Sequence, residues 1–349
     1  MTRIGVICGD GIGKEVVPAG VAALRAAARD CGVEFEFTNL PWSCDYYARH
    51  GRMMDEGGFE QLAGFDAIYL GALGAPGVPD AASAGLILAI RQRFDQYVNL
   101  RPMRLLQGLV SPLANRGPAE IDMICVRENS EGEYSGVGGR IHRGTPHEVA
   151  QQTAVFTRHG IERIVRYAFD LARTRPRKAL ASATKSNALT HSMVMWDEIA
   201  ESVRKDYPDV EFRKYHVDAL AARMITHPQS LDVIVSSNLF GDILTDIGSA
   251  ISGSLGIAPG ANINPTRAFP SMFEPIHGSA PDIAGQGIAN PIGAIWAAAL
   301  MAKHLGHEAI HDRILGAIER VVAAGTLRTP DLGGTATTKQ MADAICSEL

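Results

Sequence analysis

Short runs of apolar and β-branched residues alternate with amphipathic stretches along the whole chain. This alternation is typical of an α/β fold with a largely parallel sheet, because each buried strand is followed by a helix that crosses back over the sheet. The predicted strands are 4–8, 33–37, 67–70, 123–126, 180–183, 210–215 and 231–236. Glycine and proline concentrate in 71–79 and 253–265, so both stretches are predicted as loops.

Residues 133–148 are poor in helix formers and rich in glycine, with Val137 and Ile141 among polar residues. Two structures explain this composition equally well. One is a β-hairpin arm that pairs with another subunit, because an exposed strand edge favours intermolecular pairing. The other is an ordinary surface loop.

The length of 349 residues exceeds one ordinary core, so two domains or one large α/β unit with an insertion are expected. Hydrophobic residues make up 46% of the chain, which is enough for a sizeable core. The net charge of −5, without a basic run, argues against nucleic acid or an anionic membrane as a partner. A small anionic substrate would therefore need a local group of basic residues.

The five cysteines are widely spread and lack the C-x-x-C spacing of a zinc site. They are expected as reduced thiols in a cytoplasmic protein. The chain enters its first predicted strand directly, without the pattern of a signal peptide. Its longest apolar stretch, 292–302, is shorter than the ~20 residues that span a bilayer, so no membrane helix is expected.

Two aspartates follow the predicted strand 231–236. Asp242 and Asp246 are spaced i,i+4 at the start of a helical pattern, so both project from one face. Carboxylate oxygens in this arrangement suit Mg²⁺ or Mn²⁺. Asp218, after another predicted strand, would complete the set. Taken in isolation, the spacing is more often a solvated helix N-terminus, where acidic residues favour the positive end of the dipole.

Three arginines are candidate substrate-binding residues. Arg91 and Arg101 are ten residues apart, and Arg127 follows the predicted strand 123–126. Guanidinium groups bind carboxylates bidentately and stay charged, so three of them in one pocket would suit a di- or tricarboxylate. Taken singly, most arginines are surface residues.

Tyr134 and Lys185 are the candidate proton-transfer groups. The phenol could act as a general acid if a neighbouring cation lowers its pKa from ~10, and Lys185 is the candidate for that cation. The alternative for the tyrosine is packing as an amphipathic side chain, and for the lysine solvation after a strand.

Two segments suggest contact with a nucleotide. The glycines of 9–13 follow the first strand, but they lack the third glycine of a Rossmann fingerprint, so a tight strand-to-helix turn near a ligand is predicted. Residues 273–283 are predicted as a long loop that could wrap an adenine ring and bind a ribose through Asp282. A plain surface loop is the alternative.

Taken together, these segments resemble the β-decarboxylating dehydrogenases, the family of isocitrate, 3-isopropylmalate, homoisocitrate and tartrate/D-malate dehydrogenases. The resemblance covers essentially the whole chain. It is carried by 9–13, 91–101, 127–134, Lys185 with Asn187, 217–219, 238–246, 274–283 and 288–291.

The resemblance implies two interleaved α/β domains of the isopropylmalate dehydrogenase type, which is not a Rossmann fold. The first domain, 1–97 plus 253–349, would contain both chain ends and bind NAD. The second domain, 98–252, would hold the metal and substrate residues and form the homodimer, with a dimer-forming arm.

The same resemblance assigns the site residues. Tyr134, Lys185 and Asp218 are implied as catalytic, and Mg²⁺ or Mn²⁺ is implied to bind Asp218, Asp242 and Asp246, with Lys185 and Asp218 coming from the second subunit. K⁺ is a further candidate ion. The implied substrate-binding residues are Arg91, Arg101, Arg127, Ile87 and Asn187. The implied cofactor-binding residues are Gly74, Glu274, His277, Gly278, Ser279, Ala280, Asp282, Ile283 and Asn290.

The implied activity is NAD-dependent oxidative decarboxylation of a small 2-hydroxy dicarboxylate. Asp282 would repel the extra phosphate of NADP. The sequence around the first arginine favours D-malate or tartrate over isocitrate, with 3-isopropylmalate as the alternative substrate. Two further classes are a regulatory homologue that binds NAD or a dicarboxylate without turnover, and a metal-dependent hydrolase.

Overall fold

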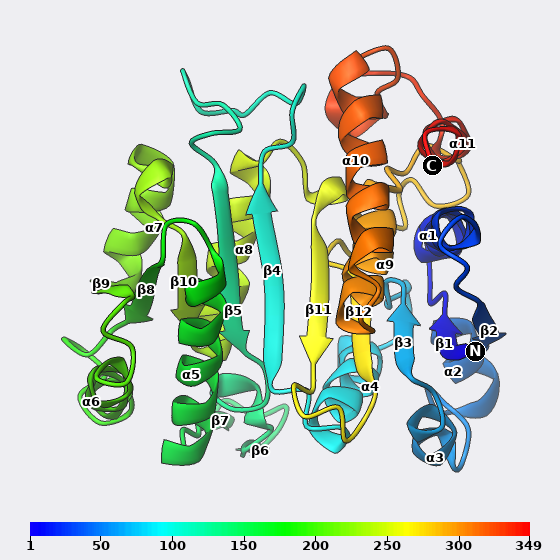
Figure 1. Cartoon of the computed structure of the whole chain (residues 1–349). Helices are drawn as coiled ribbons and strands as arrows, with labels where there is room; N and C mark the ends of the chain where they lie inside the picture. The colour runs from blue at the N-terminus through cyan, green and yellow to red at the C-terminus, as the bar shows by residue number, and fades with distance from the viewer.

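A ten-stranded sheet runs through the molecule in the computed structural model, which describes residues 1–349 (Figure 1). The strand order is β2-β1-β3-β12-β11-β4-β5-β10-β8-β9. The strands are β1 Thr2–Ile7, β2 Phe35–Asn39, β3 Ala67–Leu70, β4 Val98–Arg104, β5 Asp122–Glu128, β8 Ala179–Thr184, β9 Glu211–His216, β10 Val233–Ser236, β11 Pro259–Ile263 and β12 Ser271–Pro275. Both flanks of the sheet are parallel, and β12, β11, β4 and β5 are joined by antiparallel pairings. The predicted α/β fold with a largely parallel sheet is confirmed.

The seven predicted strands are present, with ends that differ by a few residues. The prediction missed the central strands β4, β11 and β12. The predicted loop 253–265 is wrong where it overlaps β11, and the predicted loop 273–283 is wrong at its first three residues, which belong to β12. All residues of β11 and β12 are buried, but glycine, proline, asparagine and glutamate interrupt the apolar pattern that would have marked them as strands.

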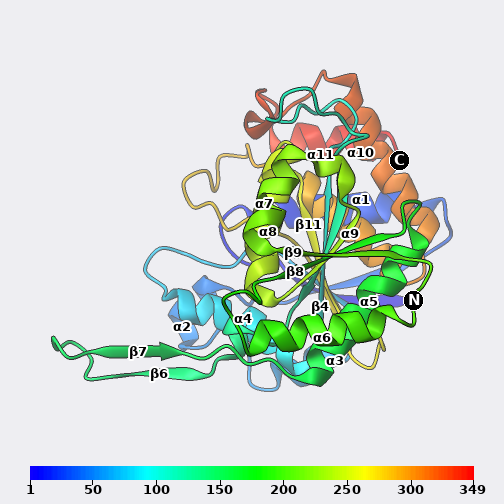
Figure 2. The same cartoon turned by 90° about the vertical axis from the view of Figure 1, so that its left-hand side faces the viewer.

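Helices cover both faces of this sheet. Figure 2 shows α7 and α8 on one face and α5 and α9 on the other. The α-helices are α1 Gly13–Arg29, α2 Cys44–His50, α3 Gly58–Ala63, α4 Asp80–Arg93, α5 Arg158–Thr174, α6 Ser192–Arg204, α7 Val217–Thr226, α8 Asn238–Ile251, α9 Ile292–His304, α10 Glu308–Ala324 and α11 Thr338–Ser347. Short 3₁₀ turns occur at η1 Glu133–Ser135, η2 Pro228–Ser230, η3 Leu255–Ile257 and η4 Pro330–Leu332.

The apolar stretch 292–302 forms most of α9, which is buried on nearly all sides. This helix packs on β11 and β12 and is covered by α1 and α10. A helix that is apolar all round belongs in such an interior position. None of the helices combines the length and the apolar composition that crossing a bilayer requires. All five cysteines are free.

Residues 133–148 form most of a hairpin rather than an irregular loop. Strands β6 Gly138–Ile141 and β7 Val149–Gln152 pair antiparallel, and every residue in them is exposed. Figure 2 shows this hairpin projecting from the body of the molecule. The apolar side chains of Val137, Ile141 and Val149 are exposed on it. The predicted hairpin is therefore confirmed, and its pairing with another subunit stays a prediction.

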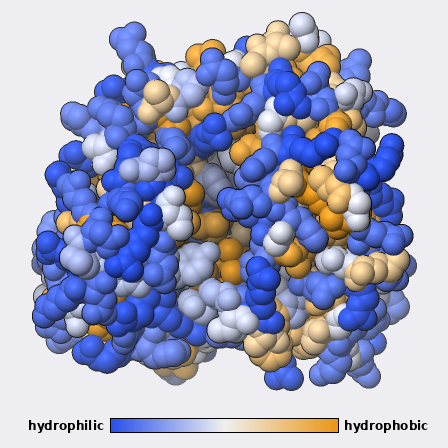
Figure 3. Space-filling view, viewed as in Figure 1, coloured by the Kyte–Doolittle hydropathy of each residue, from blue (hydrophilic) through white to orange (hydrophobic).

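The predicted domain boundaries fall where the chain enters β4 and just after it leaves α8. Figure 3 shows a largely hydrophilic face with a hollow near its middle, between the part that contains α5 and the part that contains α10. The sheet nevertheless continues from one part to the other through the pairing of β4 with β11. The division into two domains stays a prediction.

Candidate active site

Three arginines converge on one cavity of about 320 Å³. Arg91 comes from α4, Arg101 from β4 and Arg127 from β5, and their side chains are at most 9% exposed. The other lining residues are Ala84, Ile87, Leu88, Tyr134 and Asp242. The cavity therefore combines three cations and a phenol with an apolar wall, as a small dicarboxylate requires.

Asp242 is the anionic centre of this cavity. Its Oδ1 accepts hydrogen bonds from Nη1 of Arg127 at 2.5 Å and Nη1 of Arg101 at 3.3 Å. The Tyr134 hydroxyl donates to Oδ2 at 3.2 Å. Helix α8, which carries Asp242, can pack closely against β5 because Gly241 has no side chain. A Cβ at Gly241 would lie 2.6 Å from Cγ of Arg127.

The charges in this cavity shift one another's pKa values. Burial alone would raise the pKa of Asp242, but Arg127 and Arg101 hold it below its ordinary value. Burial and the charge of Arg101 lower the pKa of Arg127 to about 9, so its guanidinium remains charged at neutral pH. Burial and the charge of Asp242 raise the pKa of Tyr134, although Arg127 opposes them. The phenol is therefore fully protonated at neutral pH.

This result corrects the prediction for Tyr134. The cation beside its ring is Arg127, whose Cζ lies 5.6 Å from the ring centroid, and the pKa of the phenol is raised rather than lowered. Lys185 of the same chain forms an ion pair with Asp218 instead.

Asp246 follows Asp242 by one helical turn. Burial and repulsion from Asp242 raise its pKa, and Arg101 only partly offsets them. Two carboxylates that disfavour each other's charge are the kind of pair that a divalent cation stabilises. No three His, Cys, Asp or Glu side chains in the chain are grouped closely enough to hold a metal ion.

Asn238 is a site residue that the sequence prediction did not assign. It precedes Asp242 by four positions on the same face of α8, and its Oδ1 accepts hydrogen bonds from Nε and Nη2 of Arg127 at 3.0 and 2.7 Å. The i,i+4 spacing that identified the two aspartates could have identified Asn238 as well.

Lys185 and Asp218 form a second group outside the arginine cavity. Lys185 follows β8, Asp218 begins α7, and Lys185 Nζ donates to Asp218 Oδ1 at 2.6 Å. This hydrogen bond and the lysine charge lower the pKa of Asp218, whose side chain is 68% exposed. Asn187 is exposed in the turn after Lys185. The chain thus separates the predicted residues into a cavity group and an exposed group.

Four predicted cofactor residues line a cavity of about 360 Å³: His277, Ala280, Ile283 and Asn290. The Nε2 atom of His277 is buried there without a hydrogen-bond partner, and burial lowers the pKa of the ring. Asp331, which also lines the cavity, accepts hydrogen bonds from Ser254 Oγ at 2.5 Å and Asn290 Nδ2 at 3.0 Å. No motif in the sequence marked Asp331.

Gly74 lines a neighbouring cavity of about 410 Å³ with Asp10, Gly11 and Lys14. The buried carboxylate of Asp10 accepts hydrogen bonds from the backbone amides of Cys44 and Gly74, both at 3.0 Å. Gly11 has φ +52°, and a Cβ there would lie 1.9 Å from the carbonyl oxygen of Ser279. The predicted tight turn between β1 and α1 is confirmed.

The remaining predicted cofactor residues differ in their surroundings. Glu274 lies on β12, and its Oε1 accepts a hydrogen bond from Arg91 Nη2 at 2.9 Å. Ser279 is tied to the first turn, because its carbonyl accepts from the Ile12 amide at 2.9 Å. Gly278 and Asp282 are exposed. Their roles stay predictions.

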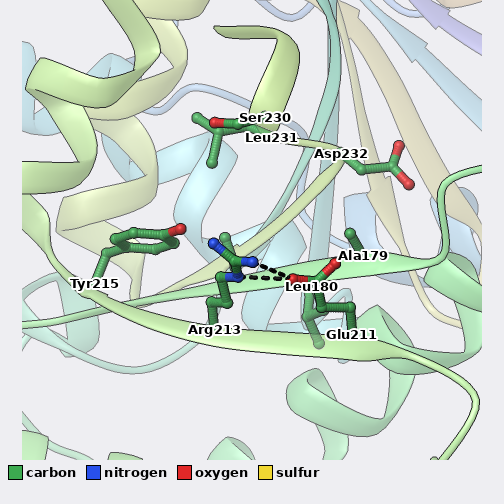
Figure 4. A pocket seen from close by; sticks show the side chains of 9 residues that line it. Ala179, Leu180, Glu211, Arg213, Tyr215, Ser230, Leu231 and Asp232 are labelled. Atoms are coloured by element: carbon green, nitrogen blue, oxygen red, sulfur yellow. Dashed lines mark hydrogen bonds and ion pairs between the residues drawn. The ribbon is translucent and has the colours of Figure 1, made fainter. Parts of the chain in front are cut away.

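A further cavity of about 230 Å³ lies at the β9 end of the sheet and contains none of the predicted site residues. Figure 4 shows Arg213 beside Glu211, with which it forms an ion pair at 2.6 Å, and Tyr215 nearby. This pairing leaves the cavity without an uncompensated charge from either residue.

Comparison with known proteins gives a family match over nearly the whole sequence. Residues 3–345 match the model of the isocitrate/isopropylmalate dehydrogenase family, and the chain belongs to this family. It is 55% identical over 352 residues to the D-malate dehydrogenase [decarboxylating] of Escherichia coli, with 99% of this chain and 97% of the relative covered. It is 54% identical over 350 residues to a probable tartrate dehydrogenase/decarboxylase of Bacillus subtilis, with 99% and 98% covered.

A solved structure supports the fold. The chain superposes on isocitrate dehydrogenase from Methylococcus capsulatus with a TM-score of 0.91, covering 100% of this chain and 99% of the other at 35% identity. The family and the decarboxylating dehydrogenases among its relatives establish the protein as an oxidoreductase that acts on a CH–OH group. The relatives support oxidative decarboxylation of a hydroxy acid.

Proposed function

We propose that the protein catalyses the NAD-dependent, Mg²⁺- or Mn²⁺-assisted oxidative decarboxylation of a small 2-hydroxy dicarboxylate, D-malate or tartrate, to a 2-oxo acid and CO₂. The observation that carries this proposal is the cavity in which Arg91, Arg101 and Arg127 surround Asp242 and Tyr134. The three cations suit two carboxylates, the aspartate suits a metal, and the phenol suits proton donation.

The residues fit a divalent cation. The charge of Asp242 helps to raise the pKa of Asp246, and no basic side chain forms an ion pair with Asp246. Asp218 of a second subunit would add the third carboxylate, because within one chain it lies in the exposed group with Lys185. K⁺ is a further candidate ion of this function.

The residues also fit NAD. His277 presents an unpartnered buried nitrogen to a cavity lined by Ala280, Ile283 and Asn290, which suits an adenine ring. Asp282 is exposed on the adjoining loop and would accept hydrogen bonds from ribose hydroxyls while it repels a 2′-phosphate. Gly74, Glu274, Gly278 and Ser279 complete the proposed cofactor set.

When bound, the divalent cation would polarise the hydroxyl and carboxylate oxygens of the substrate, and NAD⁺ would accept the hydride from C2. Arg91, Arg101 and Arg127 hold the carboxylates in the reactive alignment. Lys185 helps to take the hydroxyl proton, through water. Tyr134 donates a proton at C3 after CO₂ leaves, which its raised pKa permits because the phenol is protonated at neutral pH.

We propose a homodimer with shared active sites, in keeping with a family whose members are often dimers. Two surfaces support it. The hairpin exposes Val137, Ile141 and Val149. Ile225 on α7 and Ile243 on α8 are 47% and 53% exposed, and these neighbouring helices also carry Asp218 and Asp242. Exposed apolar surface of this extent marks a contact site.

The choice of substrate rests on the wall opposite the arginines. Ala84, Ile87 and Leu88 make this wall apolar, which keeps 3-isopropylmalate as the alternative. D-malate and tartrate are favoured because relatives that are 52–55% identical over nearly their full length are named for them.

The test is NADH formation after the protein is mixed with NAD⁺, Mn²⁺ and each of D-malate, tartrate and 3-isopropylmalate. We expect absorbance at 340 nm to rise with D-malate or tartrate and to stop rising when a chelator is added. A protein that binds D-malate but reduces no NAD⁺ with any of the three acids would instead be a regulatory homologue.

A further inference from the structure

A row of buried polar side chains lies on the central strands of the sheet, next to the arginine cavity. Its middle member is Asn262 on β11, which is fully buried and faces Asn99 of β4 in the antiparallel register. Asn262 Oδ1 accepts hydrogen bonds from Nδ2 of Asn99 at 2.8 Å and Nδ2 of Asn129 at 2.9 Å. Its own Nδ2 donates to Glu274 Oε1 at 2.7 Å. Asn262 therefore joins three buried side chains.

This row reaches two of the three arginines. Glu274 Oε1, which accepts from Asn262, also accepts from Arg91 Nη2 at 2.9 Å. Asn99, which donates to Asn262, accepts through its Oδ1 from Arg101 Nε at 2.7 Å. Arg91 and Arg101 lie on different elements, α4 and β4, so their backbones alone do not fix one guanidinium relative to the other. The side-chain amide of Asn262 connects the two arginines, through Glu274 to Arg91 and through Asn99 to Arg101.

The connection between Arg91 and Arg101 matters for binding carboxylates. A guanidinium sits at the end of a flexible stem, and binding two carboxylates in a reactive alignment requires both guanidinium groups to be oriented beforehand. A buried polar network whose members are hydrogen-bonded is rigid, because each broken bond leaves a polar atom unpaired in a medium of low dielectric constant. An apolar residue at position 262 would leave Asn99 Nδ2 without a partner and would remove one of the two hydrogen bonds of Asn129 Nδ2 and of Glu274 Oε1.

We infer that Asn262 is a positioning residue for substrate recognition, which holds Arg91 through Glu274 and Arg101 through Asn99 in one relative orientation. This inference rests on the proposed function, since it assumes that the two arginines bind substrate carboxylates. It assigns no contact between Asn262 and the substrate or the nicotinamide.

Two substitutions of Asn262 test it. Asn262→Leu removes every hydrogen bond of the side chain. Asn262→Asp keeps the acceptor for Asn99 and Asn129 but, when ionised, replaces the donor to Glu274 by a second carboxylate, so it breaks the connection to Arg91 and gives an isosteric variant if the leucine variant fails to fold. We expect the KM for D-malate to rise about tenfold in the aspartate variant and further in the leucine variant, and the KM for NAD⁺, to which Asn262 is connected only through Glu274, to rise clearly less.

Asn264→Leu is the matched control. Asn264 is also a buried asparagine, directly after β11, and its Nδ2 donates to the carbonyl of Phe94 at 2.9 Å. It has no hydrogen bond to the arginines or to their partners. We expect its loss to lower the thermal stability about as much as the Asn262 substitutions, while the KM for D-malate stays within twofold of the wild type.

A second readout separates this inference from the proposed function. Calorimetric titration with malonate, a dicarboxylate without a hydroxyl group, measures the arginine cavity without turnover. Weaker malonate binding in Asn262→Asp than in Asn264→Leu supports the positioning role even if no hydroxy acid is oxidised. Equal malonate affinity in both variants, or equal rises in both KM values, overturns it.

Discussion

The two groups of predicted catalytic residues are built in different ways. In the arginine cavity, Asp242 is bound by two cations that are almost completely buried, and the cavity is closed by elements of a single chain. In the second group, Lys185 and Asp218 satisfy only each other, and the side chain of Asp218 is 68% exposed. The first group thus consists of buried cations around one carboxylate, and the second is an ion pair at the molecular surface.

This difference indicates which group can contribute to the site of a second subunit. Breaking a buried ion pair is expensive, because a charge is left without compensation. A pair at the surface is screened by water and can exchange its partner at little cost. Lys185 and Asp218 are therefore free to serve the cavity of a second subunit, whereas the arginines are not.

The largest expected effect comes from the buried group. Asp242→Asn removes the charge that compensates Arg127 and that is proposed to bind the metal, so kcat/KM for D-malate should fall roughly 10³-fold. Steady-state kinetics with Mn²⁺ measure it. Asp343→Asn is the control, since Asp343 is exposed and pairs only with Lys339, and its kcat/KM should stay within twofold. A decrease of less than tenfold for Asp242→Asn would contradict the central role of this carboxylate.

Mixing two inactive variants tests whether the exposed group is shared. If each site uses Asp242 of one subunit and Asp218 of the other, a heterodimer of Asp242→Asn and Asp218→Asn has one intact site. Random reassociation should then restore about a quarter of the wild-type activity, because half of the dimers are mixed and each has one of two sites. No recovery, with mixed dimers shown by native mass spectrometry, would mean that each chain builds its own site.

Tyr134→Phe tests whether Tyr134 is the proton donor of the arginine cavity. The variant retains the ring beside Arg127 but loses the proton donor, so decarboxylation should slow about 10²-fold. Hydride transfer should slow less. Rapid-quench measurement of CO₂ and stopped-flow measurement of NADH follow the two steps separately. If both steps slow equally, Tyr134 is not the group that protonates C3.

The smallest expected effect concerns the exposed loop at the cofactor cavity. Asp282→Ala removes a carboxylate that would bind ribose hydroxyls, so the KM for NAD⁺ should rise about tenfold while that for NADP⁺ falls. Initial rates with both cofactors give the ratio. Gln286→Ala, on the same exposed loop, should leave the ratio unchanged. An unchanged ratio in the Asp282 variant would remove its role in cofactor choice.

The flanks of the fold were predictable and its centre was not. Strands such as β3 and β10 are buried apolar runs, which periodicity detects. The central strands β4, β11 and β12 carry Arg101, Asn262 and Glu274, and these polar residues hide the apolar pattern. The strands that build the site are therefore the ones that sequence patterns miss.

The residue types of the site were predictable, but their partners were not. The spacing of Asp242 and Asp246 and the three arginines indicated a metal and a dicarboxylate, and the structure brings the arginines and Asp242 together. The contact between Tyr134 and Asp242 joins residues 108 positions apart, and no local pattern reveals it. The ion pair between Lys185 and Asp218 was not predicted, and the role of both residues in the site of a second chain stays a prediction.

Strands β4 and β11 run antiparallel in the middle of the sheet and join its two parts, one from β2 to β11 and the other from β4 to β9. Since this is the one sheet pairing between the two parts, a rotation of one part against the other would have to bend the sheet here. The facing residues Asn99 and Asn262, which are hydrogen-bonded across this pairing, would then move little relative to each other. A rotation of this kind would therefore change the distance between the outer strands of the sheet more than the spacing of these two central amides.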